Sequence, residues 1–137
     1  MAYATRAQIE ARYGLDELIQ ATDRDGVGVE TDAAITNALD DASAEADSYI
    51  GSRYDIPVST SPRLVQVTCA IARYRLHEDH ATDQIRRDYD DAVKWLRDIG
   101  AGRAVLPGAS SGVVTATNVK VLASDRVFTD TYLATMP

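Results

Sequence analysis

One segment, residues 64–76, is apolar on nearly every side of the helix that it would form, and this feature constrains the fold most. Ser61 and Pro62 precede it, and a serine N-cap followed by proline at the first helical position marks a helix start. We expect this helix to run to about Glu78. Because its first three turns offer little polar surface, other helices must cover it. The segment therefore predicts the central helix of a bundle.

Two longer segments each have one apolar face, which is the pattern of helices that pack against a central helix. The first is expected over residues 32–53. Its apolar stripe consists of Ile35, Ala38, Leu39, Ala42, Ala46, Tyr49 and Ile50. The second is expected from residue 82 or 83 to residue 100 or 102. Its stripe consists of Ile85, Tyr89, Ala92, Val93, Leu96 and Ile99.

The N-terminal part predicts shorter elements. Thr5 and Gln8 fit a capping box, in which each side chain satisfies a backbone amide at the start of the helix. Gly14 is expected to stop this short helix, and Asp16 can cap a further turn. Residues 22–28 read as a loop. Together these signals predict an all-α fold, a small bundle of about four helices around a central apolar helix.

The composition changes after residue 102. Residues 1–102 carry 11 basic and 19 acidic residues, a net charge of −8, whereas residues 103–137 carry three basic and two acidic ones, a net charge of +1. Glycine, serine and proline are frequent up to residue 112, and β-branched residues without a helical period follow. The sequence thus predicts a helical bundle over residues 1–102, a flexible linker over 103–112 and an extended C-terminal arm over 113–137.

The arm carries apolar side chains that a disordered tail normally lacks. Val127, Phe128, Tyr132 and Leu133 lie close together, and Phe128 is the single phenylalanine of the chain. The residues leave two interpretations open. The arm either folds back onto its own bundle or docks onto another subunit, by strand addition or by anchoring side chains in a groove.

Candidate chemical sites are weak. His77 and His80 are three residues apart rather than four, and they fall where a helix should end. Aligning Asp23 with the first position of a calcium loop puts Ala34 at the twelfth, where a carboxylate is needed. Cys69 is the single cysteine and lies in the most apolar helix, which favours a packing role. The sequence therefore predicts no catalytic residue, no metal site and no cofactor.

Charge limits the classes of partner. The chain has 14 basic and 21 acidic residues, a net charge of −7, which argues against a nucleic-acid binder that works by phosphate neutralisation. The acidic runs at residues 40–41, 45–47 and 88–91 are most simply solvated helix faces. A sharper interpretation is a surface that lines a channel and repels DNA passing through it. No apolar run is long enough for a membrane span, and the N-terminus lacks a secretory pattern, so we expect a cytosolic origin.

Five stretches together resemble a known family: residues 9–14, 46–57, 69–76, 89–96 and 126–128. The second contains the unusual run Tyr-Ile-x-x-Arg-Tyr-x-x-Pro. Their order and spacing resemble small proteins from the morphogenesis region of Mu-like phages and prophages. That family is similar in helical layout to phage head–tail connector proteins, also called head-completion adaptors.

The resemblance implies a structural protein of the virion, made in the cytoplasm of the bacterial host and located at the head–tail junction. Such connectors assemble as a ring, commonly of twelve copies, beneath the portal. The implied partners are further copies of the chain, the portal protein and a tail-completion protein. Genomic DNA would pass through the lumen without specific binding. The resemblance implies no membrane contact and offers no catalytic residues.

The same resemblance favours a role for the arm between subunits. Arg126 would then make a charge-assisted contact with an acidic bundle surface. The candidate inter-subunit anchors are Arg126, Val127, Phe128, Tyr132 and Leu133.

Three other classes of protein are alternatives to the connector. A small non-enzymatic binding or regulatory adaptor, acting as a monomer or dimer, would explain the bundle but not the arm. An enzyme with a dispersed site is disfavoured because the helix stripes contain almost no ionisable residue. A DNA-binding helix-turn-helix is disfavoured because the candidate recognition helices are acidic.

Overall fold

The computed structural model describes residues 2–23, 26 and 32–109. Within these ranges the chain forms five α-helices and no strand. They are α1 (Arg6–Tyr13), α2 (Leu15–Thr22), α3 (Asp32–Ile50), α4 (Pro62–Leu76) and α5 (Asp83–Gly100). The prediction of an all-α bundle is confirmed. In this part of the chain, no helix has both the length and the hydropathy needed to cross a membrane.

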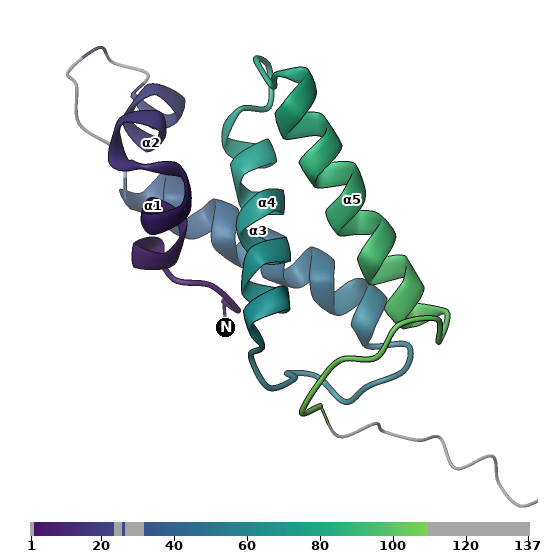
Figure 1. Cartoon of the computed structure of the whole chain (residues 1–137). Helices are drawn as coiled ribbons and strands as arrows, with labels where there is room; N and C mark the ends of the chain where they lie inside the picture. Colours follow the sequence, from purple (N-terminus) through teal and green to yellow (C-terminus); the bar gives the residue numbers. More distant parts are fainter. Residues whose placement is uncertain (1, 24–25, 27–31, 110–137) are drawn as a thin grey trace, which may run out of the picture.

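Helix α4 is the centre of the bundle. Figure 1 shows α4 between α1 and α5, with α3 passing behind it. The side chains of Leu64, Val67 and Ile71 on α4 are essentially inaccessible to solvent, as are those of Ile35 on α3 and Leu96 on α5. Burying one such aliphatic side chain contributes about 1.5–3 kcal/mol. The apolar helix expected from the sequence is thus the helix that the others cover.

The helix starts follow the local signals in the sequence. The Gln8 backbone N–H donates to the Thr5 hydroxyl at 3.3 Å, and the Thr5 N–H donates to the Gln8 side chain at 2.8 Å, so the capping box forms. Ser61 caps α4 and Thr82 caps α5 through their hydroxyl groups. Gly14 separates α1 from α2 with φ of 87°, a conformation that favours glycine.

Some boundaries differ from the expected ones. The further turn expected at Asp16 is a complete helix, α2, whose Leu18 is buried. Helix α3 ends at Ile50 rather than near Arg53, because the chain continues as a tight turn in which the Tyr54 N–H still donates to the Ile50 carbonyl at 2.9 Å. Helix α4 ends at Leu76, two residues before the expected end.

The segment after α5 folds back onto the bundle. Leu106 is 1% exposed, and its N–H donates to the Tyr54 hydroxyl at 3.3 Å. The Arg53 guanidinium donates to the Ala104 carbonyl at 3.3 Å. Residues 103–109, which form most of the expected linker, therefore make specific contacts with the turn after α3. The division into bundle, linker and arm otherwise stays a prediction, because residues 110–137 lie outside the described part.

Candidate functional site

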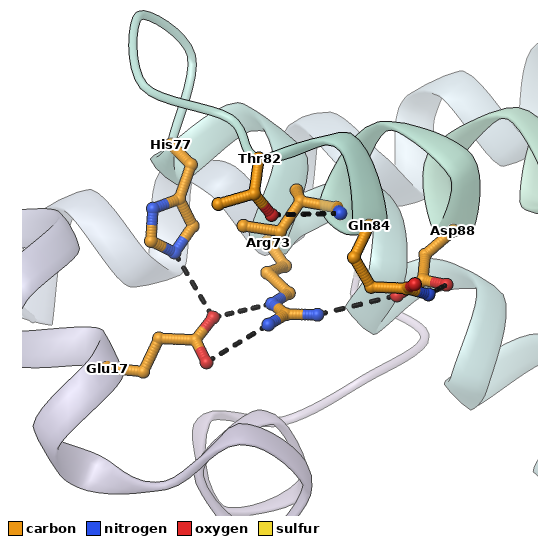
Figure 2. A network of polar contacts seen from close by, with 7 residues as sticks. Glu17, Arg73, His77, Thr82, Gln84 and Asp88 are labelled. Carbon is orange, nitrogen blue, oxygen red and sulfur yellow. Dashed lines mark hydrogen bonds and ion pairs between the residues drawn. The ribbon is translucent and has the colours of Figure 1, made fainter.

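A polar network joins α2, α4 and α5, and Figure 2 shows it from close by. Both carboxylate oxygens of Glu17 on α2 pair with the guanidinium of Arg73 on α4, one of them at 3.1 Å from Nη2. Arg73 Nη1 lies 3.4 Å from Asp88 Oδ2 on α5. His77 Nε2 lies 3.2 Å from Glu17 Oε1. These groups are partly buried, so the network fixes the short N-terminal helices on the bundle.

Arg73 is also covered by an aromatic ring. The centre of the Tyr13 ring lies 4.3 Å from the guanidinium carbon, which is a cation–π contact. Burial raises the pKa of the Tyr13 hydroxyl. Arg73 therefore contacts carboxylates at its edge and an aromatic ring on its face, and its position depends on α1, α2 and α5 together.

A second network joins α3, α4 and α5 around Glu45. Its carboxylate accepts from Arg75 Nη2 at 2.8 Å and from the Tyr89 hydroxyl at 2.8 Å. The Tyr89 ring stacks on Tyr74 with centroids 4.2 Å apart. Burial, together with the hydrogen bond to Glu45, raises the pKa of Tyr89 to about 12. The phenol thus remains a donor to this carboxylate throughout the neutral range.

A third network fixes the N-terminal segment. The Tyr3 hydroxyl donates to the Asp47 carboxylate and accepts from the Val58 N–H at 3.3 Å. The Tyr3 N–H donates to the Ser43 hydroxyl at 2.9 Å. Burial of the ring raises the pKa of Tyr3 to about 12. Residues far apart in the chain meet here on the side of α3.

The acidic runs therefore contain two kinds of carboxylate, those that join helices and those that are exposed. Glu45, Asp47 and Asp88 join helices, as described above, whereas the carboxylates of the pairs 40–41 and 90–91 are exposed. The interpretation as solvated faces fits the exposed pairs. The joining role was missed in the sequence, although these residues lie at the borders of the apolar stripes, which is the signal that could have found it.

The histidine pair and the cysteine have structural surroundings. His77 contacts Glu17, whereas His80 is exposed in the turn before α5. Across residues 2–23, 26 and 32–109, histidine, cysteine and carboxylate side chains do not gather in threes as a metal ion would need. Cys69 is fully buried, and its burial raises the pKa of the thiol to about 11, so it packs as a protonated core group.

Two hollows open beside these networks. The first lies between α1, α4 and α5 and has a volume of about 380 Å³. Its apolar lining is Tyr13, Val67, Ala70 and Ala92. Its polar lining is Arg12, Arg63, Gln66, Asp88 and Asp91. This hollow thus combines an apolar surface with charges of both signs.

The second hollow lies between α1 and the start of α4 and has a volume of about 470 Å³. Ala11, Pro62 and Val65 are its apolar lining, and no acidic residue lines it. Arg12 lines both hollows, so they adjoin, and we call the two together the α1–α4 groove. No carboxylate of the described residues pairs with Arg12.

Comparison with known families identifies the family to which this chain belongs. The family described as "Bacteriophage Mu, Gp36" matches residues 3–124, which include all five helices. The chain belongs to this family. The resemblance to proteins of Mu-like phages, drawn from the sequence, is confirmed.

Two relatives of this Gp36 chain are phage or prophage proteins. The "Mu-like prophage FluMu protein gp36" of Haemophilus influenzae is 39% identical over 101 residues, which cover 73% of this chain and 72% of the relative. "Gene product J" of Escherichia phage Mu is 35% identical over 113 residues, which cover 81% of this chain and 79% of the relative. The similarity is therefore spread over most of each protein.

The candidate arm anchors are not placed by these findings. Residues 126–133, which contain all five, lie outside the described residues and beyond the end of the Gp36 match at residue 124. Their role as inter-subunit anchors stays a prediction.

Proposed function

We propose that this Gp36-family protein is a non-enzymatic structural subunit of the phage particle. It assembles as a ring beneath the portal and joins the DNA-filled head to the tail. The observation that carries the proposal is that the whole helical body belongs to a family from phage Mu. The partly buried charges of this body join helices instead of converging on one reactive centre, which suits a rigid building block.

The charge of the body supports passage of DNA. The chain has a net charge of −7, and the carboxylates of Asp40 and Asp41 on α3 and of Asp90 on α5 are exposed. A ring multiplies this charge, and a lumen of one sign repels phosphate of the same sign. DNA would then slide through the ring without binding to it.

The proposed partners follow from this position. Each subunit contacts two neighbouring copies, the portal protein on the head side and a tail-completion protein on the other side. A ring requires a heterologous contact whose rotation closes. The C-terminal arm, with Arg126, Val127, Phe128, Tyr132 and Leu133, is the proposed source of that contact.

Quantitative mass spectrometry of purified virions tests the proposal. The chain should be present in particles at a copy number comparable to that of the portal protein. A prophage with an early stop codon in this gene should accumulate DNA-filled heads and separate tails. If the chain is absent from mature virions, or if the stop codon leaves the phage yield unchanged, the connector role is wrong and a regulatory adaptor explains the bundle better.

A further inference from the structure

The arm and the α1–α4 groove have matching patterns. In an extended segment, alternate residues lie on one face. Arg126, Phe128, Asp130 and Tyr132 would therefore share a face, in the order cation, aromatic ring, carboxylate, aromatic ring. In the groove, the lining of the first hollow includes the carboxylates of Asp88 and Asp91 together with Arg12 and Arg63. The lining of the second hollow includes Arg12 and no acidic residue.

We propose that, in the assembled ring, the segment 126–133 of a neighbouring copy lies extended in the α1–α4 groove. Phe128 occupies the hollow lined by Val67, Ala70 and Ala92, and Tyr132 occupies the one lined by Pro62 and Val65. This inference rests on the proposed function, because it supplies the contact that links one subunit of the ring to the next.

Charge complementarity fixes the direction of the segment. With Phe128 in the first hollow, Arg126 lies beside the carboxylates in the lining of that hollow, Asp91 and Asp88, the second of which also pairs with Arg73. Asp130 then lies opposite Arg12, which lines both hollows. In the reverse direction Arg126 would extend past the second hollow, whose lining contains no acidic residue. Only the first direction therefore places both Arg126 and Asp130 beside a residue of opposite charge.

The dimensions of the segment suit the groove. Four residues of extended chain span about 13 Å, which is the distance available between Phe128 and Tyr132. The two hollows adjoin, because Arg12 lines both of them. The two aromatic side chains can thus enter adjoining hollows without a bend in the chain.

The chain is long enough to reach another subunit. The described part ends at residue 109, which leaves 16 residues before Arg126. Extended, they span at most about 55 Å, compared with a radius of gyration of about 13 Å for a domain of this size. The distance therefore also permits binding to its own groove, so the experiment must separate the two cases.

Mixing two full-length variants distinguishes binding of the arm to a neighbouring copy from binding to its own groove. In the arm variant, Phe128→Ala and Tyr132→Ala remove the side chains that enter the groove. In the groove variant, Arg12→Glu reverses the central charge while the arm stays intact. Neither variant should form oligomers by itself. Mixed in equal amounts, they should form a one-to-one heterodimer, because one variant still has an arm and the other still has a groove.

Light scattering after size exclusion gives the masses, and far-UV circular dichroism checks that each variant is folded. Arg86→Glu is the matched control, since Arg86 is an exposed arginine of α5 that does not line the groove. It should assemble as the unmodified protein does. A further variant, Arg12→Glu combined with Asp130→Arg on one chain, should recover most of the lost assembly because the ion pair is restored with its charges exchanged.

Three results would overturn the inference. Monomers in the mixture, with both variants less stable than the unmodified protein, would mean that each arm binds its own groove. Variants that still assemble separately would mean that another surface links the subunits. An unmodified protein that stays monomeric at every concentration would also contradict the arm exchange. None of these results decides the connector role, which the measurement on virions tests separately.

Discussion

The guanidinium of Arg73 meets a different partner on each side: Glu17, Asp88 and the face of Tyr13. A lysine at this position would keep the charge but lose the paired hydrogen bonds and the flat surface over the ring. Because the surroundings are partly buried, the lost contacts are replaced by water only in part.

We therefore expect Arg73→Lys to lower the free energy of unfolding by about 1–2 kcal/mol. Urea denaturation measures this value. Arg97→Lys, at an exposed position of α5, is the control and should change stability by less than about 0.5 kcal/mol. Equal effects of the two substitutions would show that the network around Arg73 contributes nothing measurable.

The two phenols in carboxylate networks make stability depend on alkaline pH. The pKa of both Tyr3 and Tyr89 is raised from 10.0 to about 12 in the folded chain. The folded state thus keeps protons that the unfolded state loses, so the stabilisation is complete below pH 10 and declines as the pH rises towards 12. Urea midpoints across this range should fall less steeply for Tyr89→Phe than for the unmodified protein. Identical slopes would contradict the proposed linkage.

At the scale of elements, the segment after α5 shows how one side chain closes the bundle. Leu106 is 1% exposed, whereas its neighbour Val105 is 70% exposed. Leu106→Ala should lower the free energy of unfolding by about 2–4 kcal/mol, because it leaves a cavity in a packed core. Val105→Ala is the control and should stay within about 0.5 kcal/mol. Thermal denaturation distinguishes them, and similar melting temperatures would mean that this segment does not pack on the bundle.

The packing of this same segment on the bundle could not be predicted from the sequence. Caps, stripes and the all-round apolar pattern predicted α3, α4 and α5 to within three residues at their ends, because these signals are local in the sequence. Leu106 stands beside Pro107 and Gly108, a composition typical of linkers, and nothing nearby shows that its partner is Tyr54. The Arg73 network was missed for the same reason, since its members come from three helices and meet only in the fold.

At the scale of the whole molecule, the described core lies before the arm in the sequence. Every helix and every buried residue named above lies within residues 2–109, and the turn around Leu106 closes the end of the bundle. A chain that ends after residue 109 should therefore keep the helical far-UV signal of the full-length protein. The truncated chain should lose only the contacts that the arm makes.

On the connector proposal, what the arm provides is assembly. Full-length protein should scatter light as an oligomer whose mass grows with concentration towards that of a closed ring, whereas the chain truncated after residue 109 should stay at the mass of a monomer. The reason is electrostatic as well as steric, because bodies with net negative charge repel one another and need a specific contact to associate. If the truncated chain forms the same oligomer, the faces of the bundle hold the ring together and the arm has another task.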